Sequence, residues 1–564
     1  MRSQTDSDAA LDPTRNVVVE ASAGTGKTWV LVERYHELLR VGVDPAHILC
    51  LTFTRQAAAE MRARVVNKLR EDDDTVDGKE RWQTLQDKLG DFNIDTIDAF
   101  CHGLLREFPL EAGLEPGFRI ADETEIYRFT EDALDRVMQE APRIAQQDSD
   151  VALTLAEMTA PQLRKSLSNE LRRRVESSKA QGLFSAKDRR TAEQVEEDTR
   201  RALQKFFQTL PDGIERFVEK GPKRHPRFAM LAKDVLRCMP GSDLGTGAQL
   251  RSLLERLEMH FLTQAGTPRK RLWNDYSSDT FPSEDAEDDR KSHQKTVEQS
   301  AEHLLKISQD FRAGLNDAQA RGFRRLFSMT EKEYRQALKR TATLDFPELQ
   351  DQALELLRQM DEFAQSRYRL ESRYHHVLID EVQDISQAQW ALVKLLTDSW
   401  VEGLGVSVEP SIFAVGDRKQ SIYKFRNANA LVFDDVVDHI GQLRPEQAEQ
   451  DVRISLKKSW RSRPALLNFV NHLCDGIEKE KGRSDAFEYR SEDRFQIEPS
   501  TSDDHQLRLG LAIADKERPC EVAVAQEIQR LLDDGEVWDK KLAKLRRVEP
   551  ADVGILSRSR ASHR

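Results

Sequence analysis

Cysteine is scarce in this sequence, and the few cysteines present lie far apart. Five occur among 564 residues, namely Cys50, Cys101, Cys238, Cys474 and Cys520. None belongs to a CxxC pair, and no histidine stands at the spacing from them that is typical of zinc ligands. The sequence therefore indicates neither a disulfide framework nor a structural zinc site.

Long apolar runs and an excess of positive charge are also missing. No stretch approaches the roughly 18 to 20 apolar residues of a membrane span, and the N-terminus lacks the apolar segment of a signal peptide. We therefore expect a cytoplasmic protein with no membrane partner. The net charge of −12 argues against a protein that coats nucleic acid with its whole surface. Basic residues still gather at 164–165, 172–174, 223–227 and 269–271, each group being either part of a nucleic-acid groove or a solvated helix face.

Strand and helix signals alternate near the N-terminus. Strand signals at 16–20 and 48–52 are each followed by a helical pattern, and two more strand signals, 377–379 and 412–415, end in acidic or glycine-containing loops. This alternation predicts an α/β fold with a parallel sheet, in which ligands bind at the carboxyl ends of the strands. A chain of this length exceeds what one core supports, so we expect several domains.

The loop after the first strand signal has the composition of a phosphate-binding loop. Its residues are Ala21, Ser22, Ala23, Gly24, Thr25, Gly26, Lys27 and Thr28, with Ala21 in place of the usual first glycine. Small residues let backbone N–H groups surround phosphates, a lysine neutralises the β- and γ-oxygens, and a hydroxyl ligates Mg²⁺. Placed between a strand and a helix, the loop predicts ATP binding, with Thr28 as a Mg²⁺ ligand. The alternative is a glycine-rich turn formed by chance.

A cluster of carboxylates follows the strand signal at 377–379. Asp380 is suited to hold Mg²⁺ through water, and Glu381 to orient and deprotonate the water that attacks the γ-phosphate. An acidic cluster after a strand is often only a solvated turn. The phosphate-binding loop upstream favours the catalytic interpretation.

The form Asp-Glu-Val-Gln-Asp at 380–384 resembles the second motif of the UvrD/Rep branch of superfamily 1 DNA helicases. Further segments resemble that family's motifs in the family's order: 51–61, 96–101, 344–346, 415–426 and 456–462. Within the family the sequence is most similar to the AddA and RecB type of recombination-repair helicase-nuclease. Segments 20–28, 106–113 and 459–462 carry that similarity.

The resemblance implies roles for individual residues. Lys27, Asp380 and Glu381 would be catalytic, together with Gln420 as γ-phosphate sensor and Arg461 as an arginine that stabilises the transition state. Trp460 would stack on the adenine, although core packing is an alternative for its ring. The DNA contacts implied are Phe53, Arg55, Thr96, Tyr423, Phe425 and Arg426. For the aromatic residues a buried core position is the alternative, and for the arginines a salt bridge with nearby acids.

The same resemblance implies a P-loop NTPase with RecA-like parallel sheets. We expect a first motor domain in two parts, 1–122 and 341–440, separated by a helical insertion at 123–340 that carries a flexible acidic loop at 283–289. A second RecA-like domain is expected at 441–564. Nothing after residue 462 resembles motifs V and VI or a nuclease domain, so we expect that domain to be incomplete.

The implied activity is an ATP- and Mg²⁺-dependent 3′-to-5′ helicase. It would travel on single-stranded DNA and unwind duplex ends in recombinational repair of double-strand breaks, and its partner would be a second, AddB-like subunit. The alternative is a truncated remnant that binds ATP or DNA without productive unwinding. An ABC or SMC ATPase is disfavoured, because those proteins lack the Gln383 form of the second motif.

Overall fold

The computed structural model describes residues 9–71, 76–174, 190–211, 213–237, 247–270, 276–359, 362–398, 400, 409–421, 432–443, 452–478, 480, 487–497, 519–539 and 542–556. Contacts divide the chain into two units. The first comprises Met1–Leu456 and Lys481–Phe487, and the second comprises Lys457–Glu480 and Glu488–Arg564. Among the described residues, no helix has the length and apolarity needed to cross a bilayer.

A six-stranded parallel sheet lies at the centre of the first unit, with the strand order β3-β2-β6-β7-β1-β8. Its strands are β1 (Val17–Ala21), β2 (Ile48–Thr52), β3 (Ile94–Thr96), β6 (His376–Ile379), β7 (Ser411–Gly416) and β8 (Arg453–Leu456). The predicted α/β fold with a parallel sheet is therefore confirmed. The carboxyl ends of all six strands lie at one edge, where residues from distant parts of the sequence meet.

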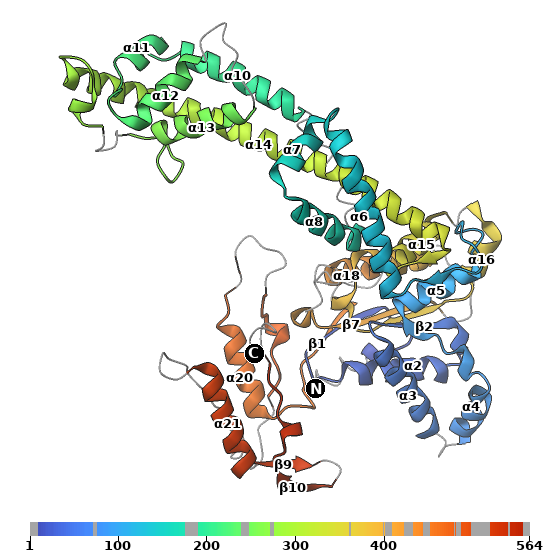
Figure 1. The fold of residues 1–564 in the computed structure, drawn as a ribbon. Coiled ribbons are helices and arrows are strands. Elements are labelled where there is room, and N and C mark those ends of the chain that lie inside the picture. Colours follow the sequence, from blue (N-terminus) through green and yellow to red (C-terminus); the bar gives the residue numbers. More distant parts are fainter. Residues whose placement is uncertain are drawn as a thin grey trace. The chain divides into compact units, whose positions relative to one another are not determined.

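Both faces of the sheet are covered by helices (Figure 1). Val17 and Val19 of β1 belong to the core on one face, whereas Val18 between them belongs to the core on the other. Successive strand residues point to opposite faces, so a strand covered on both sides must be apolar throughout. The covering helices are α2 (Lys27–Arg40) and α3 (Arg55–Glu71) on the first face, and α5 (Ile97–Glu107), α15 (Phe346–Gln359), α17 (Gln387–Thr397) and α18 (Val432–Leu443) on the second.

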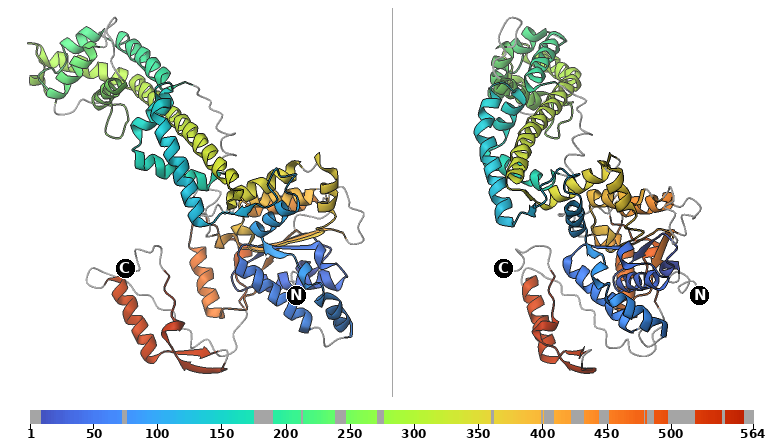
Figure 2. Two further views of the ribbon diagram at one scale, coloured as in Figure 1. Left: turned by 45° about the vertical axis from the view of Figure 1, so that its right-hand side comes forward. Right: turned by 90° about the vertical axis from the view of Figure 1, so that its right-hand side faces the viewer.

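A helical insertion leaves the sheet region through β4 (Arg119–Ile120) and returns through β5 (Thr343–Leu344), which pair in parallel. The long helix α14 (Ala286–Arg340) runs through the whole insertion (Figure 2). Its C-terminal half packs with one set of helices in a proximal cluster, and its N-terminal half packs with another set in a distal cluster. The proximal set is α6 (Glu123–Ala145), α7 (Ser149–Glu157) and α8 (Ala160–Arg172), and the distal set is α10 (Ala192–Gln208), α11 (Gly213–Glu219), α12 (Pro226–Arg237) and α13 (Gly247–Phe261).

A buried ionic junction fixes the insertion to the sheet domain. Arg174, which follows α8, donates to Asp345 and Glu348 of the segment that opens α15. The hydroxyl of Tyr334 on α14 also donates to Asp345, at 2.7 Å. Removing one partner of such a buried pair typically costs about 3–5 kcal/mol. The junction therefore holds α8, α14 and α15 in one arrangement.

The structure corrects the expected flexible loop at 283–289. Residues from Ala286 onward are helical, and the first turn of α14 contains Glu287, Asp288 and Asp289. Asp289 is buried and accepts hydrogen bonds from Ser283 and from Lys220, the latter at 3.0 Å. Carboxylates are favourable at a helix N-terminus, where the backbone N–H groups and the helix dipole are positive. The acidic run is thus a helix start rather than a break.

The boundary between the units also differs from the predicted one at 441. Strand β8 pairs in parallel with β1, so the first unit extends to Leu456. A short apolar strand has the same pattern whichever sheet it joins, and the sequence alone does not identify its partner. The second unit has helices α20 (Pro464–Asp475) and α21 (Cys520–Asp534) and an antiparallel pair formed by β9 (Glu536–Asp539) and β10 (Lys544–Arg547).

Two buried histidines face each other in the distal cluster. The Nε2 atoms of His260 and His293 are 3.0 Å apart, and Nδ1 of His260 lies 3.2 Å from the hydroxyl of Tyr276. Burial lowers the pKa of His293 to about 3. Burial, with the nearby His293 and Arg269, also lowers the pKa of His260 well below its usual value. The folded cluster therefore excludes protons that the unfolded chain binds near pH 6.5.

We predict that the distal cluster loses stability as the pH falls below about 6.5, by up to about 1.4 kcal/mol per pH unit for each histidine. The sign follows because the unfolded state binds more protons than the folded state over this range. Hydrogen exchange of the α13 amides, corrected for its intrinsic pH dependence, measures the effect. His293→Phe should flatten the pH dependence, whereas His303→Gln, which changes an exposed imidazole on the same helix, should not. Equal slopes in the wild type and His293→Phe would contradict the prediction.

Candidate nucleotide site and adjoining cleft

The phosphate-binding loop closes tightly between β1 and α2. Gly24 and Gly26 have φ angles of 81° and 96°, in the left-handed region that favours glycine. The backbone N–H and the hydroxyl of Thr25 both donate to the carbonyl of Ser22, at 3.2 and 2.8 Å. Ala21 is buried at the end of β1; its φ is not positive, so the missing first glycine is not required there. The loop and the first turn of α2 thus form a frame for phosphate oxygens.

The carboxylate cluster lies at the same edge of the sheet. Nζ of Lys27 donates to Oε2 of Glu381 at 2.6 Å, joining residues that are 354 positions apart. Glu381 has a left-handed backbone, with φ 50° and ψ 52°. Such a conformation is uncommon for a residue other than glycine and typically persists where surrounding contacts hold it. The strand ends therefore bring the predicted lysine and the predicted general base into direct contact.

Two further carboxyl groups, those of Asp380 and Asp384, lie beside this pair, and Lys27 alone does not neutralise all three acids. Burial, and then the neighbouring Glu381, raise the pKa of Asp380 to about 6. Burial, followed by Glu381 and Asp380, raises the pKa of Asp384 to about 7, although Lys27 acts in the opposite direction. In addition, Oδ1 of Asp384 is buried without a hydrogen-bond partner. A cation at this edge would relieve both conditions.

Mg²⁺ fits this set of residues. It prefers oxygen ligands and is usually held by one or two carboxylates together with substrate phosphates. Asp380 and the hydroxyl of Thr28 would hold it, and the ion would supply charge neutralisation for the β- and γ-phosphates. In the described part of the chain, no three Asp, Glu, His or Cys residues could hold a metal by themselves.

A short hydrogen-bond chain extends from Glu381 to Gln420. Nε2 of Gln383 donates to Glu381 at 2.8 Å, and its Oε1 accepts from the backbone N–H of Asp417 at 2.8 Å. Oδ2 of Asp417 in turn accepts from Nε2 of Gln420, also at 2.8 Å. The structure thus connects the predicted γ-phosphate sensor to the predicted general base. Gln383 and Asp417 are the links.

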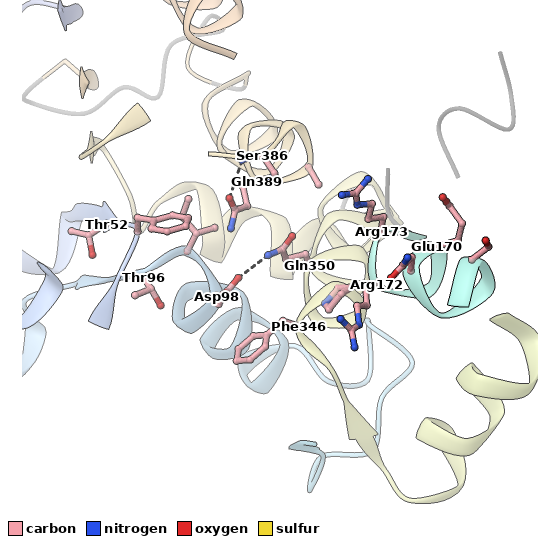
Figure 3. Close-up of a pocket in the computed structure, with 16 residues that line it drawn as sticks. Thr52, Thr96, Asp98, Glu170, Arg172, Arg173, Phe346, Gln350, Ser386 and Gln389 are labelled. Atoms are coloured by element: carbon pink, nitrogen blue, oxygen red, sulfur yellow. Dashed lines mark hydrogen bonds between the residues drawn. The ribbon is translucent and has the colours of Figure 1, made fainter. Parts of the chain in front are cut away.

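A polar cleft of about 860 Å³ lies between the sheet domain and the insertion (Figure 3). A second hollow of about 550 Å³ shares four of its lining residues, so the two form one groove. The shared residues are Phe53, Thr96, Asp98 and Phe346. The hydroxyl of Thr96 caps α5 by accepting from the N–H of Ala99 at 3.1 Å. Arg55 is exposed and lines the second hollow.

One wall of the groove is basic. Arg172 and Arg173 at the end of α8 are exposed and line it, whereas Arg174 points into the buried junction. Among the described residues of the basic groups at 164–165, 172–174, 223–227 and 269–271, those that line this groove are Arg172 and Arg173. Arg164 instead forms ion pairs with Glu131 and Asp135, which is the solvated-face alternative.

Five predicted residues are not part of the described site in the first unit. Tyr423, Phe425 and Arg426 fall outside the described residues. Trp460 and Arg461 belong to the second unit. Trp460 is 74% exposed, which argues against its core-packing alternative, and the ammonium of Lys458 lies 4.3 Å from the centroid of its ring.

The sequence reasoning missed Phe346 as a lining residue and the linking roles of Gln383 and Asp417. Phe346 is 43% exposed although it follows a buried strand and opens a helix. The signal that could have identified it is its place in segment 344–346, which resembles one of the family's motifs. The orientation of the Gln383 amide had no signal in the sequence.

Comparison with known proteins gives a consistent result. The model of the UvrD/REP helicase N-terminal domain matches residues 2–217 and 241–440. Three relatives are each named as a subunit of an ATP-dependent helicase/nuclease. They come from Natranaerobius thermophilus (25% identical, 96% of this chain, 45% of the relative), Ligilactobacillus salivarius (24%, 98% and 46%) and Enterococcus faecalis (26%, 97% and 46%). The chain thus spans about half the length of these relatives.

We predict that Asp380→Asn abolishes the dependence of nucleotide binding on Mg²⁺. The wild type should bind a fluorescent ATP analogue more tightly with Mg²⁺ than with a chelator, because Asp380 would help to hold an ion that neutralises the phosphates. The variant should bind equally under both conditions. Asp95→Asn is a matched control, since Asp95 lies exposed on β3 of the same sheet. A Mg²⁺ effect that persists in Asp380→Asn would contradict the assignment.

Proposed function

Because the chain belongs to the UvrD/REP helicase family, we propose that it is the ATP-binding portion of a DNA helicase that acts in recombinational repair of double-strand breaks. The contact between Lys27 and Glu381 carries this proposal, with Asp380 and Asp384 beside it. It unites a phosphate-binding lysine, a general base and a Mg²⁺ carboxylate at one sheet edge. The relatives, which are named as helicase/nuclease subunits, support the repair setting.

In this proposal each residue has a defined task in ATP hydrolysis. Lys27 and the loop bind the β- and γ-phosphates, and Glu381 orients the attacking water and accepts its proton. Gln420 contacts the γ-phosphate, and Arg461 neutralises charge on it in the transition state. Trp460 stacks on the adenine. The exposure of Trp460 leaves its ring available for that contact.

The groove is proposed as a binding site for single-stranded DNA. Phe53 and Phe346 offer aromatic faces, and base stacking on such rings contributes about 1–3 kcal/mol per base without selecting sequence. Arg172 and Arg173 line the same groove and supply charge for phosphates. Arg55, Thr96, Tyr423, Phe425 and Arg426 complete the proposed set of DNA contacts.

The larger assembly is proposed from the relatives. We place the chain in the cytoplasm, with RecA-like motor domains that travel 3′ to 5′ and with a second helicase-nuclease protein as its partner at duplex ends. The partner is proposed from the word subunit in the names of the relatives. The location, the RecA-like domains and the polarity are proposed from the resemblance to the helicase family.

The first test is nucleotide binding and hydrolysis by this chain, with and without single-stranded DNA. Lys27→Ala should weaken binding of an ATP analogue by about tenfold or more, since it removes a charged hydrogen-bond donor worth about 1.5–3 kcal/mol. Lys88→Ala is the matched control, because Lys88 pairs with Asp44 on the same domain. Hydrolysis stimulated by DNA and abolished by Lys27→Ala supports a motor. Equal nucleotide binding by wild type and Lys27→Ala would contradict the proposal.

The second test concerns the groove. Changing both Arg172 and Arg173 to alanine should weaken binding of single-stranded DNA and lower the salt slope by about 1.4, because each phosphate contact contributes about 0.7. Fluorescence anisotropy over a salt series measures this slope. Arg136→Ala provides a control, since Arg136 is an exposed arginine of the insertion paired with Glu333. An unchanged slope in the double variant would place DNA elsewhere.

A further inference from the structure

We propose that Gln383 is a positioning residue that holds Glu381 on Lys27 until a γ-phosphate replaces it. This inference rests on the proposed function, because it assumes that the loop binds a nucleoside triphosphate. Glu381 then has two positions, one on the lysine and one beside the attacking water. Gln383 stabilises the first position and so sets how strongly the site prefers a triphosphate over a diphosphate.

The carboxamide of Gln383 is fixed at both ends. The residue is 1% exposed, its oxygen accepts from the N–H of Asp417, and its amide nitrogen donates to Glu381. The hydroxyl of Ser421 also donates to the backbone carbonyl of Gln383, at 3.1 Å. Gly416 leaves no spare room, since a Cβ there would collide with Oε1 of Gln383. The amide nitrogen therefore has one fixed position, aimed at the carboxylate of Glu381.

Glu381 accepts the hydrogen bond from Nζ of Lys27 that a bound phosphate would need. Its Oε2 accepts from Lys27 and from Gln383 at once. In phosphate-binding loops the lysine reaches the β- and γ-phosphates, so the γ-phosphate competes with this carboxylate. The left-handed backbone of Glu381 adds strain that these two contacts must outweigh. When the γ-phosphate takes Lys27, that strain favours departure of Glu381 from its present position.

The same amide links this exchange to Gln420. The backbone N–H of Asp417 donates a hydrogen bond to Gln383, and the carboxylate of Asp417 accepts one from the side-chain amide of Gln420. A ligand shifts such an equilibrium only through contacts that differ between the two states. Here the differing contact is the bond between Gln383 and Glu381, which belongs to the state without a γ-phosphate. Loss of that bond should therefore favour triphosphate binding selectively.

Two variants remove the bond in different ways. Gln383→Leu deletes the donor, and Gly416→Ala displaces the carboxamide while leaving Lys27, Glu381 and Gln383 in the sequence. Gln387→Leu is the matched control, because Gln387 also donates to a carboxylate, that of Asp435 at 2.8 Å, but on the exposed surface nearby. Circular dichroism of each variant reports whether it is folded. If Gln383→Leu fails to fold, Gly416→Ala decides the outcome.

The experiment compares the Kd of a non-hydrolysable ATP analogue with the Kd of ADP, both with Mg²⁺. The ratio of the ADP value to the triphosphate value should rise about two- to tenfold in Gln383→Leu and in Gly416→Ala, the effect of losing one hydrogen bond from the competing state. The ratio should stay unchanged in Gln387→Leu. A purely structural role would weaken both nucleotides in parallel.

The outcomes separate this inference from the proposed function. An unchanged or lowered ratio in the folded variants, with the wild type still binding through Lys27, overturns the role of Gln383 and leaves the proposed function standing. Nucleotide binding that is absent in the wild type, or insensitive to Lys27→Ala, overturns both. A raised ratio in the two variants and not in the control supports the inference.

Discussion

The ion pair between Lys27 and Glu381 is the contact on which the nucleotide site depends. It forms only when β1 and β6, with β7 between them, end at the same edge of the parallel sheet. The whole helical insertion separates these strands in sequence, so the pair can form only after the strands on both sides of the insertion have joined one sheet. Burial first, and then the neighbouring carboxylates, raise the pKa values of Asp380 and Asp384, and Lys27 only partly offsets this. These charges suit the cation and phosphates that the proposed function requires.

A second buried charge group determines the wall of the groove. Arg174 is held by Asp345 and Glu348 with Tyr334 beside them, which fixes the end of α8 against α15. Because neighbouring residues at a helix end point in different directions, anchoring Arg174 leaves Arg172 and Arg173 facing the cleft. One run of three arginines thus has both a structural and a proposed binding role. Net charge alone indicates neither.

The features that follow from local pattern were predictable, and those that depend on long-range pairing were not. Apolar strands and the glycines of the loop follow from residue type and spacing, so the sheet and the position of Lys27 could be predicted. The partner of β8 could not, because a four-residue pattern does not specify which strand it pairs with. The acidic start of α14 was mistaken for a loop, since acids favour helix starts and flexible segments alike. The contacts of Gln383 could not be predicted either, because they depend on the orientation of its side chain, which residue type and spacing do not specify.

The sheet edge also connects the nucleotide site to the groove. Glu381 is followed by a single 3₁₀ turn, Val382–Asp384, and then by Ser386, which caps α17 and lines the groove. Phe53 and Thr96 line the same groove where β2 and β3 end, and β2 is the direct neighbour of β6. A change in the left-handed backbone of Glu381 must be absorbed within that turn or passed to α17. The turn is buried and hydrogen-bonded to the segment after β7, and closely packed interiors transmit strain rather than absorb it. In the proposed function, α17 would therefore couple nucleotide and single-stranded DNA without direct contact between them.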